Sequence, residues 1–264
     1  MSDQNREVLR VENLSIQFGG LKAVDNLSFS VRKGEIFGLI GPNGAGKTTV
    51  FNCITQFYKP DSGAVWFFNG EGEINLVGLP VHQIITYGLV RTFQNVEVIK
   101  ELSVIDNVLI GAHISFKATV FEQALRLPRA RREEVALREK AEQVLKLLGI
   151  ADRKEMLAGG QPYGVLKKVE LARTLMCAPK LIILDEPAAG LNDGETDGLA
   201  ETIRKIRDAY QCAILLVEHD MRLIMGVCDR VCAISFGKFL AVGTPDEIRI
   251  DKSVQEAYLG ECDG

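Results

Sequence analysis

One segment of the 264-residue chain has the spacing of a loop that binds phosphate: Gly41-Pro42-Asn43-Gly44-Ala45-Gly46-Lys47-Thr48. Its glycines let the backbone turn so that successive N–H groups converge on one anion, and the helix expected after it adds a partial positive charge. The Lys47 ammonium can reach the β- and γ-phosphates, and the Thr48 hydroxyl can ligate Mg²⁺. We therefore predict a nucleoside triphosphate site formed by this loop and the adjacent Thr49.

An acidic pair supplies a second half for such a site. Asp185 and Glu186 follow the apolar run at residues 181–184. A carboxylate at the C-terminal edge of a strand can hold Mg²⁺, and we assign this role to Asp185. The next carboxylate can polarise an attacking water, which makes Glu186 the candidate general base. Alone, an acidic pair after a strand is commonly just a turn, but together with the phosphate loop it predicts nucleotide hydrolysis.

The elements that must position these residues alternate between strand and helix. Short apolar runs indicate strands buried on both faces, as in a parallel sheet: residues 36–40, 181–184 and 213–217. Helical patterns accompany them: residues 46–55, 165–177 and 194–209. A smaller antiparallel sheet is expected from alternating or aromatic-rich segments: residues 8–18, 27–31 and 64–69. The predicted fold class is α/β, a P-loop NTPase core with a mainly parallel sheet, an antiparallel β subdomain and an inserted α-helical subdomain.

The predicted insertion interrupts this alternation of strands and helices between residues 96 and 160. Ser103 should cap a helix there, with Asp106 three residues later. Residues 131–148 form an amphipathic pattern whose apolar stripe includes Val135 and Leu148, typical of a solvated helix in a bundle. We predict a nucleotide-binding core at residues 1–95 and 161–264 and a helical subdomain at residues 96–160.

Composition narrows the range of partners. The net charge of −4 and a pI near 5.6 argue against nucleic acid, because binding to a phosphate backbone depends on clustered positive charge. The N-terminus is polar and every apolar run is far shorter than the ~20 residues that cross a bilayer, so a membrane would be served from outside the lipid. The six cysteines predict reduced thiols in an intracellular protein, with a metal site at Cys228 and Cys232 as the alternative.

With these motifs in this order, the sequence resembles the nucleotide-binding family of ABC transporters across nearly its whole length. The resemblance implies that ATP and Mg²⁺ are bound. Phe18 lies where the family places an aromatic ring on adenine, with Val24 nearby; the alternative is that Phe18 is a core residue of a strand. Gln94 matches the glutamine of the Q-loop, which senses the γ-phosphate and Mg²⁺ and links to the membrane subunit.

Two later segments extend the resemblance. Residues 189–192 are similar to the D-loop, and His219, just past the apolar run at residues 213–217, matches the switch histidine that orients the γ-phosphate. The resemblance thus implies a catalytic set of Lys47, Glu186 and His219. It also implies that two such cassettes close around two ATP molecules and open after hydrolysis.

A closer resemblance is to the ATP-binding subunit of branched-chain amino acid importers, carried by five segments: residues 18–24, 41–60, 88–94, 185–192 and 257–260. It implies two membrane-spanning permease subunits, a second cassette in a homo- or heterodimer and, indirectly, a periplasmic or extracellular solute-binding protein. It also implies a peripheral location on the cytoplasmic face of the cell membrane. Related ATPases serve urea or short-chain amide uptake or lipopolysaccharide export, so cargo and direction stay open at this point.

One motif departs from the family pattern. The signature loop L-S-G-G-Q should stand at the N-terminus of a helix, where it meets the γ-phosphate held by the opposite subunit. In the register we favour it reads Gln161-Pro162-Tyr163-Gly164-Val165. Pro162 lacks both the serine hydroxyl and an N–H, and Val165 replaces a polar glutamine. The upstream segment at residues 157–161 is similar in composition but requires four extra residues before the helix.

Two other functions share the fold. An ABC ATPase acting on DNA or ribosomes is disfavoured by the acidic balance and by the lack of a second cassette or a long coiled-coil insertion. A regulatory subunit that binds ATP without hydrolysing it is compatible with the unusual signature.

Overall fold

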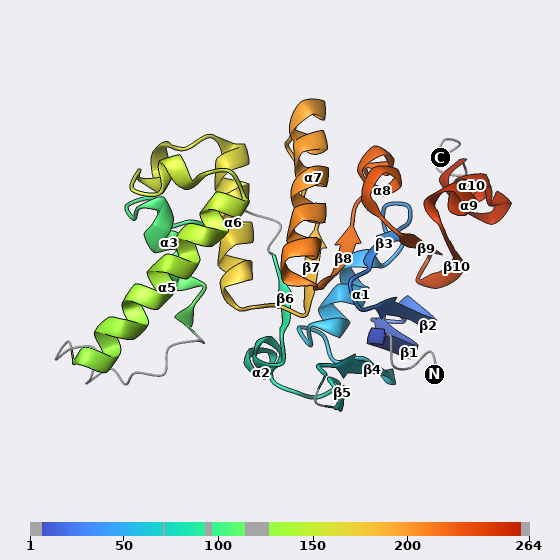
Figure 1. The fold of residues 1–264 in the computed structure, drawn as a ribbon. Helices are drawn as coiled ribbons and strands as arrows, with labels where there is room; N and C mark the ends of the chain where they lie inside the picture. Colours follow the sequence, from blue (N-terminus) through green and yellow to red (C-terminus); the bar gives the residue numbers. More distant parts are fainter. Residues whose placement is uncertain (1–6, 71, 93–96, 114–126, 260–264) are drawn as a thin grey trace. The chain divides into compact units, whose positions relative to one another are not determined.

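A computed structural model of the chain describes residues 7–70, 72–92, 97–113 and 127–259 (Figure 1). Contacts divide the chain into two compact units. The sheet unit comprises Met1–Arg91 and Lys180–Gly264, and the helical unit comprises Thr92–Pro179. The sequence analysis placed the helical subdomain at residues 96–160, so the two divisions differ in where they place residues 92–95 and 161–179.

The larger sheet of the sheet unit has the strand order β10-β9-β3-β8-β7-β6 and is parallel except for β10, which runs antiparallel to β9. Its strands are β3 (Ile36–Ile40), β6 (Leu89–Arg91), β7 (Leu181–Asp185), β8 (Ala213–Val217), β9 (Arg230–Ser235) and β10 (Lys238–Gly243). Every residue of β3, β7 and β8 is buried, and this explains why their sequences are unbroken apolar runs. The predicted parallel core is confirmed.

The smaller sheet is antiparallel, also as predicted, and has the order β2-β1-β4-β5. Its strands are β1 (Glu7–Phe18), β2 (Leu21–Arg32), β4 (Ser62–Phe68) and β5 (Glu73–Asn75). Leu9 of β1 pairs with Val31 on one side and with Phe67 on the other, and all three are fully buried. The two sheets share one apolar core, in which the rings of Phe29 and Phe37 stack at 5.6 Å.

The described residues of this unit also form six helices: α1 (Lys47–Ile54), α2 (Val81–Thr86), α7 (Asp193–Tyr210), α8 (Met221–Val227), α9 (Pro245–Ile250) and α10 (Lys252–Leu259). Helix α1 buries Val50, Phe51 and Ile54 in the shared core, which fixes the direction in which it leaves the phosphate loop. Asn192 begins α7 in a reciprocal capping box with Glu195.

The helical unit contains α3 (Val104–Ile110), α5 (Pro128–Leu147) and α6 (Tyr163–Met176), with short 3₁₀ turns at Ala151–Arg153 and Ala158–Gly160. The three helices pack on one another, and Arg173 of α6 donates to the carbonyl of Asn107 on α3 at 3.0 Å. These contacts group α6 with the insertion. The predicted cap is confirmed, since the Asp106 N–H donates to Ser103 Oγ at 3.1 Å.

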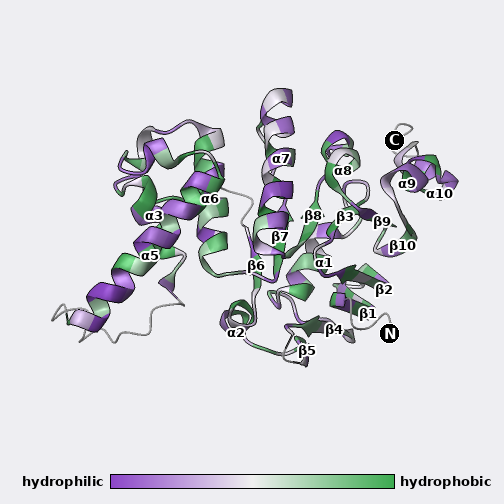
Figure 2. Ribbon diagram, viewed as in Figure 1, coloured by the Kyte–Doolittle hydropathy of each residue, from purple (hydrophilic) through white to green (hydrophobic). Residues whose placement is uncertain are grey.

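The apolar stripe of α5 differs in one position from the prediction. Figure 2 shows hydrophobic and hydrophilic residues alternating along this helix, and its buried residues are Ala130, Leu137, Ala141, Val144 and Leu145. Val135 was expected on the stripe, but it is 57% exposed, because its place on the helical turn lies away from this set. Within the described ranges, no helix combines the length and the apolar character that a membrane crossing requires.

Candidate nucleotide site

The phosphate loop lies between β3 and the start of α1, as the sequence predicted. Two of its glycines are required by close approach to other backbone segments. A Cβ on Gly41 would lie 2.2 Å from the Ile234 carbonyl oxygen, and one on Gly46 would lie 2.4 Å from that of Ala23. Gly46 also has a φ of 98°, which L side chains rarely adopt. The loop therefore sits tightly against β2 and β9, with its amides at the start of a helix.

Lys47 is folded back into this loop. Its side chain is buried, and Nζ donates to the Gly41 carbonyl at 2.6 Å and to the Pro42 carbonyl at 2.9 Å. Those bonds hold the ammonium at the centre of the loop, where a buried positive charge favours an anion.

A cavity of about 500 Å³ opens beside the loop, a size typical of small-ligand sites. It is lined by residues 21–23, residues 43–49, Glu186 and Phe236. The structure thus brings Glu186 and most of the predicted phosphate loop to one cavity. Gly41 and Pro42 are buried behind it.

Phe236 was missed by the sequence analysis. It lies in the turn between β9 and β10, is 84% exposed and has a φ of 46°. The adjacent Gly237 anchors this turn, since its N–H donates to the Ala45 carbonyl and its carbonyl accepts from the Asp25 N–H, both at 2.9 Å. The only available signal was an apolar aromatic residue next to a turn glycine, which by itself indicates no site.

Two further residues, Phe18 and Val24, were expected near adenine. The Phe18 ring is about half exposed and packs edge-on against Tyr58 at 5.3 Å between ring centroids. Val24 is fully buried in the core. Among the described residues that line the cavity, neither of the two occurs.

Asp185 ends β7 and is 5% exposed. Its carboxylate pairs with the Arg91 guanidinium at 2.8 Å, and the same guanidinium donates to the side chain of Asn52 on α1 at 2.6 Å. The Asp185 carboxylate and the Thr48 hydroxyl are the hard oxygen donors that Mg²⁺ prefers, so these two side chains fit the predicted metal by donor type. Gln94, the third expected ligand, lies outside the described residues.

Glu186 adopts an unusual backbone conformation. Its φ is 47°, a left-handed value uncommon for a residue other than glycine, and its N–H donates to the Val217 carbonyl at 2.9 Å. Backbone strain of this kind costs on the order of 1–3 kcal/mol and is concentrated at functional sites. The hydrogen bond ties Glu186 to the end of β8, the strand between β3 and β7.

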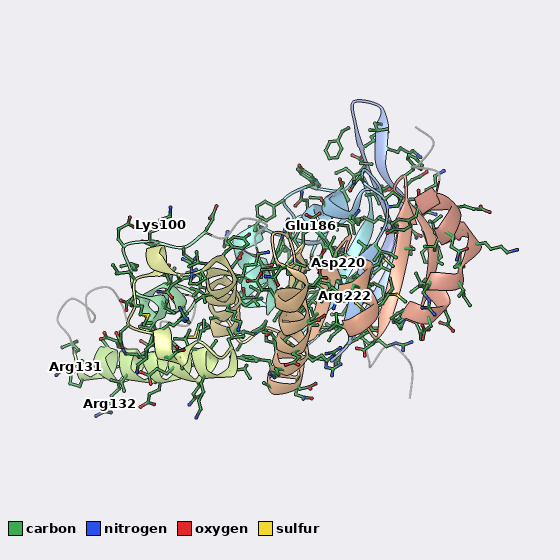
Figure 3. The ribbon with its side chains drawn as sticks, turned by 90° about the horizontal axis from the view of Figure 1, so that it is seen from above. Lys100, Arg131, Arg132, Glu186, Asp220 and Arg222 are labelled. Atoms are coloured by element: carbon green, nitrogen blue, oxygen red, sulfur yellow. The ribbon has the colours of Figure 1, made fainter. Side chains whose placement is uncertain are left out.

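His219 lies just beyond that same strand end. Its Nδ1 is 4.0 Å from Glu186 Oε1 and 3.8 Å from Glu218 Oε2. Glu218 is fully buried, and the pKa of its carboxyl is raised because the effect of burial outweighs that of the hydrogen bonds from the backbone of Ala188 and Asp220. Figure 3 labels the side chains of Glu186, Asp220 and Arg222. Glu186 directly follows β7, Asp220 is the N-cap of α8 and Arg222 lies in the first turn of that helix.

The five cysteines in the described part of the chain show neither a disulfide nor a metal cluster. None of the five in the described ranges is in a disulfide, and those ranges hold no group of three or more His, Cys, Asp or Glu side chains that could bind a metal ion. Burial raises the pKa of the Cys53 thiol to about 11, so that thiol is a poor nucleophile near neutral pH. Cys262 lies outside the described residues.

A glycine loop that opens a helix after one parallel strand, with an acidic pair ending a nearby strand, defines a P-loop nucleotide-binding protein. The comparisons with known proteins identify the family. The model of the family described as "ABC transporter" matches residues 24–189. The chain belongs to this family, whose cassettes are ATPases.

Individual relatives agree over almost the full length. The chain is 44% identical to the high-affinity branched-chain amino acid transport ATP-binding protein LivG of Salmonella typhimurium, covering 98% of this chain and 100% of the relative. It is 41% identical to the corresponding protein BraF of Pseudomonas aeruginosa, with the same coverage. A crystal structure of the ADP conformation of an ABC transporter's ATP-binding cassette superposes with a TM-score of 0.82 at 33% identity, covering 96% of this chain and 99% of that one.

Proposed function

We propose that this chain binds Mg²⁺–ATP in the cavity beside the phosphate loop and hydrolyses it to power the import of branched-chain amino acids. The observation that carries this proposal is the place of Glu186 in the wall of the cavity that the phosphate loop also lines. A general base must be within reach of the water that attacks the γ-phosphate, and this arrangement supplies one. The relatives named as branched-chain amino acid transport proteins support the cargo class.

In this proposal each side chain has a distinct role. Lys47 and the loop amides bind the phosphates, Glu186 polarises the water, and His219 orients the γ-phosphate. Thr48, Asp185 and Gln94 would hold Mg²⁺, which when bound neutralises charge that develops on the phosphates. The adenine would lie along residues 21–23, where Phe236 and, by family resemblance, Phe18 are the candidate aromatic contacts.

The assembly follows from the family. We propose that two cassettes close on ATP and act on two membrane-spanning permease subunits from the cytoplasmic face of the membrane, with an external solute-binding protein delivering the amino acid. The segment at residues 161–165 would act as the signature. Helix α6 begins at Tyr163 with Pro162 at its N-cap position, as the favoured register requires, while residues 158–160 form a 3₁₀ turn.

Glu186→Gln in the assembled transporter tests the proposal. It should lower ATP turnover by roughly 10²-fold or more while leaving ATP binding intact, so that an ATP-bound closed dimer accumulates. Glu201→Gln, an exposed carboxylate change on α7, is the matched control and should turn over ATP like the unaltered protein. Equal turnover in the Glu186→Gln and unaltered complexes would refute the role of Glu186. An unaltered complex that binds but never hydrolyses ATP would favour a regulatory subunit instead.

Transport needs its own measurement. Proteoliposomes containing the permeases and the solute-binding protein should take up leucine, isoleucine or valine only with internal ATP. Uptake of urea or a short-chain amide without uptake of these amino acids would reject the cargo class and leave the ATPase assignment standing.

A further inference from the structure

Glu218 is a buried carboxylate for which the hydrolytic scheme has no role. It directly follows β8, has no exposed surface, and does not belong to the described residues that line the cavity. Burying a charged carboxylate costs several kcal/mol unless hydrogen bonds or a counter-charge compensate. A charged Glu218 at this position therefore requires nearby groups that compensate for the lost solvation of its carboxylate.

Three backbone N–H groups from two loops supply that compensation. Oε1 accepts from the Ala188 N–H at 2.7 Å, in the loop after β7 that carries Glu186. Oε2 accepts from the N–H groups of His219 at 3.1 Å and Asp220 at 3.4 Å, in the loop after β8. One side chain thus joins the loop of the candidate base to the loop of the candidate switch histidine.

A carboxylate suits this position because it has two acceptor oxygens and no donor. A glutamine in its place could accept from only one loop and would point its NH₂ group at the donors of the other. The His219 ring also lies between two carboxylates, with Nδ1 3.8 Å from Glu218 Oε2 and 4.0 Å from Glu186 Oε1. A shift of either loop would change both separations.

We propose that Glu218 is a positioning residue that holds the Glu186 loop against the His219 loop, so that ATP hydrolysis depends on it and ATP binding does not. This rests on the proposed function. The phosphate loop is anchored separately, through Ile234, Ala23 and Gly237, and does not use the Glu218 hydrogen bonds.

Glu218→Gln in the assembled transporter is the test, read as kcat against the Kd for ATP. Misplacing catalytic groups by about 1 Å can cost on the order of 10²-fold, so we expect kcat to fall at least about tenfold with Kd unchanged within about twofold. Glu35→Gln is the matched control. Glu35 is 6% exposed, accepts from the Arg32 N–H at 2.6 Å and pairs with Arg230 at 3.0 Å, just before β3 begins. It should lose stability and keep its kcat.

Three results would overturn the inference: an unchanged kcat in Glu218→Gln, a rise in Kd as large as the fall in kcat, or an equal fall in kcat in Glu35→Gln. Hydrogen exchange in the unaltered protein tests it without a variant, in case Glu218→Gln fails to fold. The Ala188 and His219 amides should both be strongly protected, and exchange of the Ala188 amide at the rate of an open loop would contradict the link. Absence of ATP turnover in the unaltered complex would instead defeat the proposed function.

Discussion

The phosphate loop and the candidate signature segment differ in how many of their groups can hold an anion. The loop presents a hydroxyl, amides at a helix start and a buried ammonium that donates to the Gly41 carbonyl, and two of its glycines lie in close contact with neighbouring backbone. The signature segment has Pro162, with neither a hydroxyl nor an N–H, at the N-cap of α6 and the apolar Val165 in its first turn. The comparison predicts a complete set of groups for the chain's own nucleotide and a reduced set for the nucleotide of a partner cassette.

The largest expected effect is a loss of ATP affinity at the phosphate loop. Lys47→Ala removes the charge at the centre of the loop, and since it deletes more than one charge-assisted contact to phosphate, ATP affinity should fall by about 100-fold. Calorimetric titration with Mg²⁺–ATP measures it. Lys205→Ala on α7, an exposed lysine, is the control. Undiminished affinity in folded Lys47→Ala would remove the basis of the assigned site.

The next prediction concerns polar groups restored to the candidate signature segment. The double substitution Pro162→Ser and Val165→Gln restores a hydroxyl, an N–H and a polar amide at the start of α6. Steady-state ATPase activity of the assembled complex should rise by at least about twofold. The reason is that the partner's nucleotide, which faces this segment, gains contacts made in the transition state. Lys168→Gln, one turn further along α6, controls for a general change in that helix. An unchanged rate would show that the segment, as it stands, supports hydrolysis fully.

A further prediction concerns where adenine lies within the complete site. Phe236→Ala should weaken ATP binding by about tenfold if its ring stacks on adenine, and should leave inorganic tripolyphosphate binding unchanged. Phe18→Ala is the paired variant, because Phe18 is the other candidate for the adenine contact. In the structure its ring packs against Tyr58. Phe239→Ala, a half-exposed phenylalanine of β10 outside the cavity lining, is the control. A selective loss in Phe18→Ala alone would assign the adenine contact to Phe18.

The smallest effect concerns the exposed ion pairs of Arg222, near the loops that carry Glu186 and His219. Arg222 pairs with Asp193 at 3.1 Å and with Asp197 at 2.8 Å, but all three side chains are more than half exposed. Exposed ion pairs contribute little, so Arg222→Ala should change the free energy of unfolding by no more than about 1 kcal/mol in urea titrations. A larger loss would mean that the exposed pairs, and not only Glu218, hold the loops together.

Much of the site could be predicted because its signals are local. Strands β3, β7 and β8 are buried on both faces, so each appears in the sequence as an apolar run whatever its neighbours are. The loop at residues 41–48 is defined by spacing within eight residues, and Asp185 and Glu186 by their place at the end of such a run. The capping of α3 by Ser103 is likewise contained within one helical turn.

The remaining features depend on which segments meet in space. Phe236 reaches the cavity because the Gly237 N–H bonds to the Ala45 carbonyl, nearly two hundred residues earlier in the chain. Glu218 joins two loops because β7 and β8 are neighbours in the sheet, and α6 belongs with the insertion because it packs on α3 and α5. The sequence by itself determined strands β3, β7 and β8, helices α1, α6 and α7, and the phosphate loop, since the burial and spacing that define them are local. Only the tertiary structure decided which aromatic ring stands beside that loop and which carboxylate joins the loops after β7 and β8, since hydrogen bonds between distant segments leave no periodic pattern in the sequence.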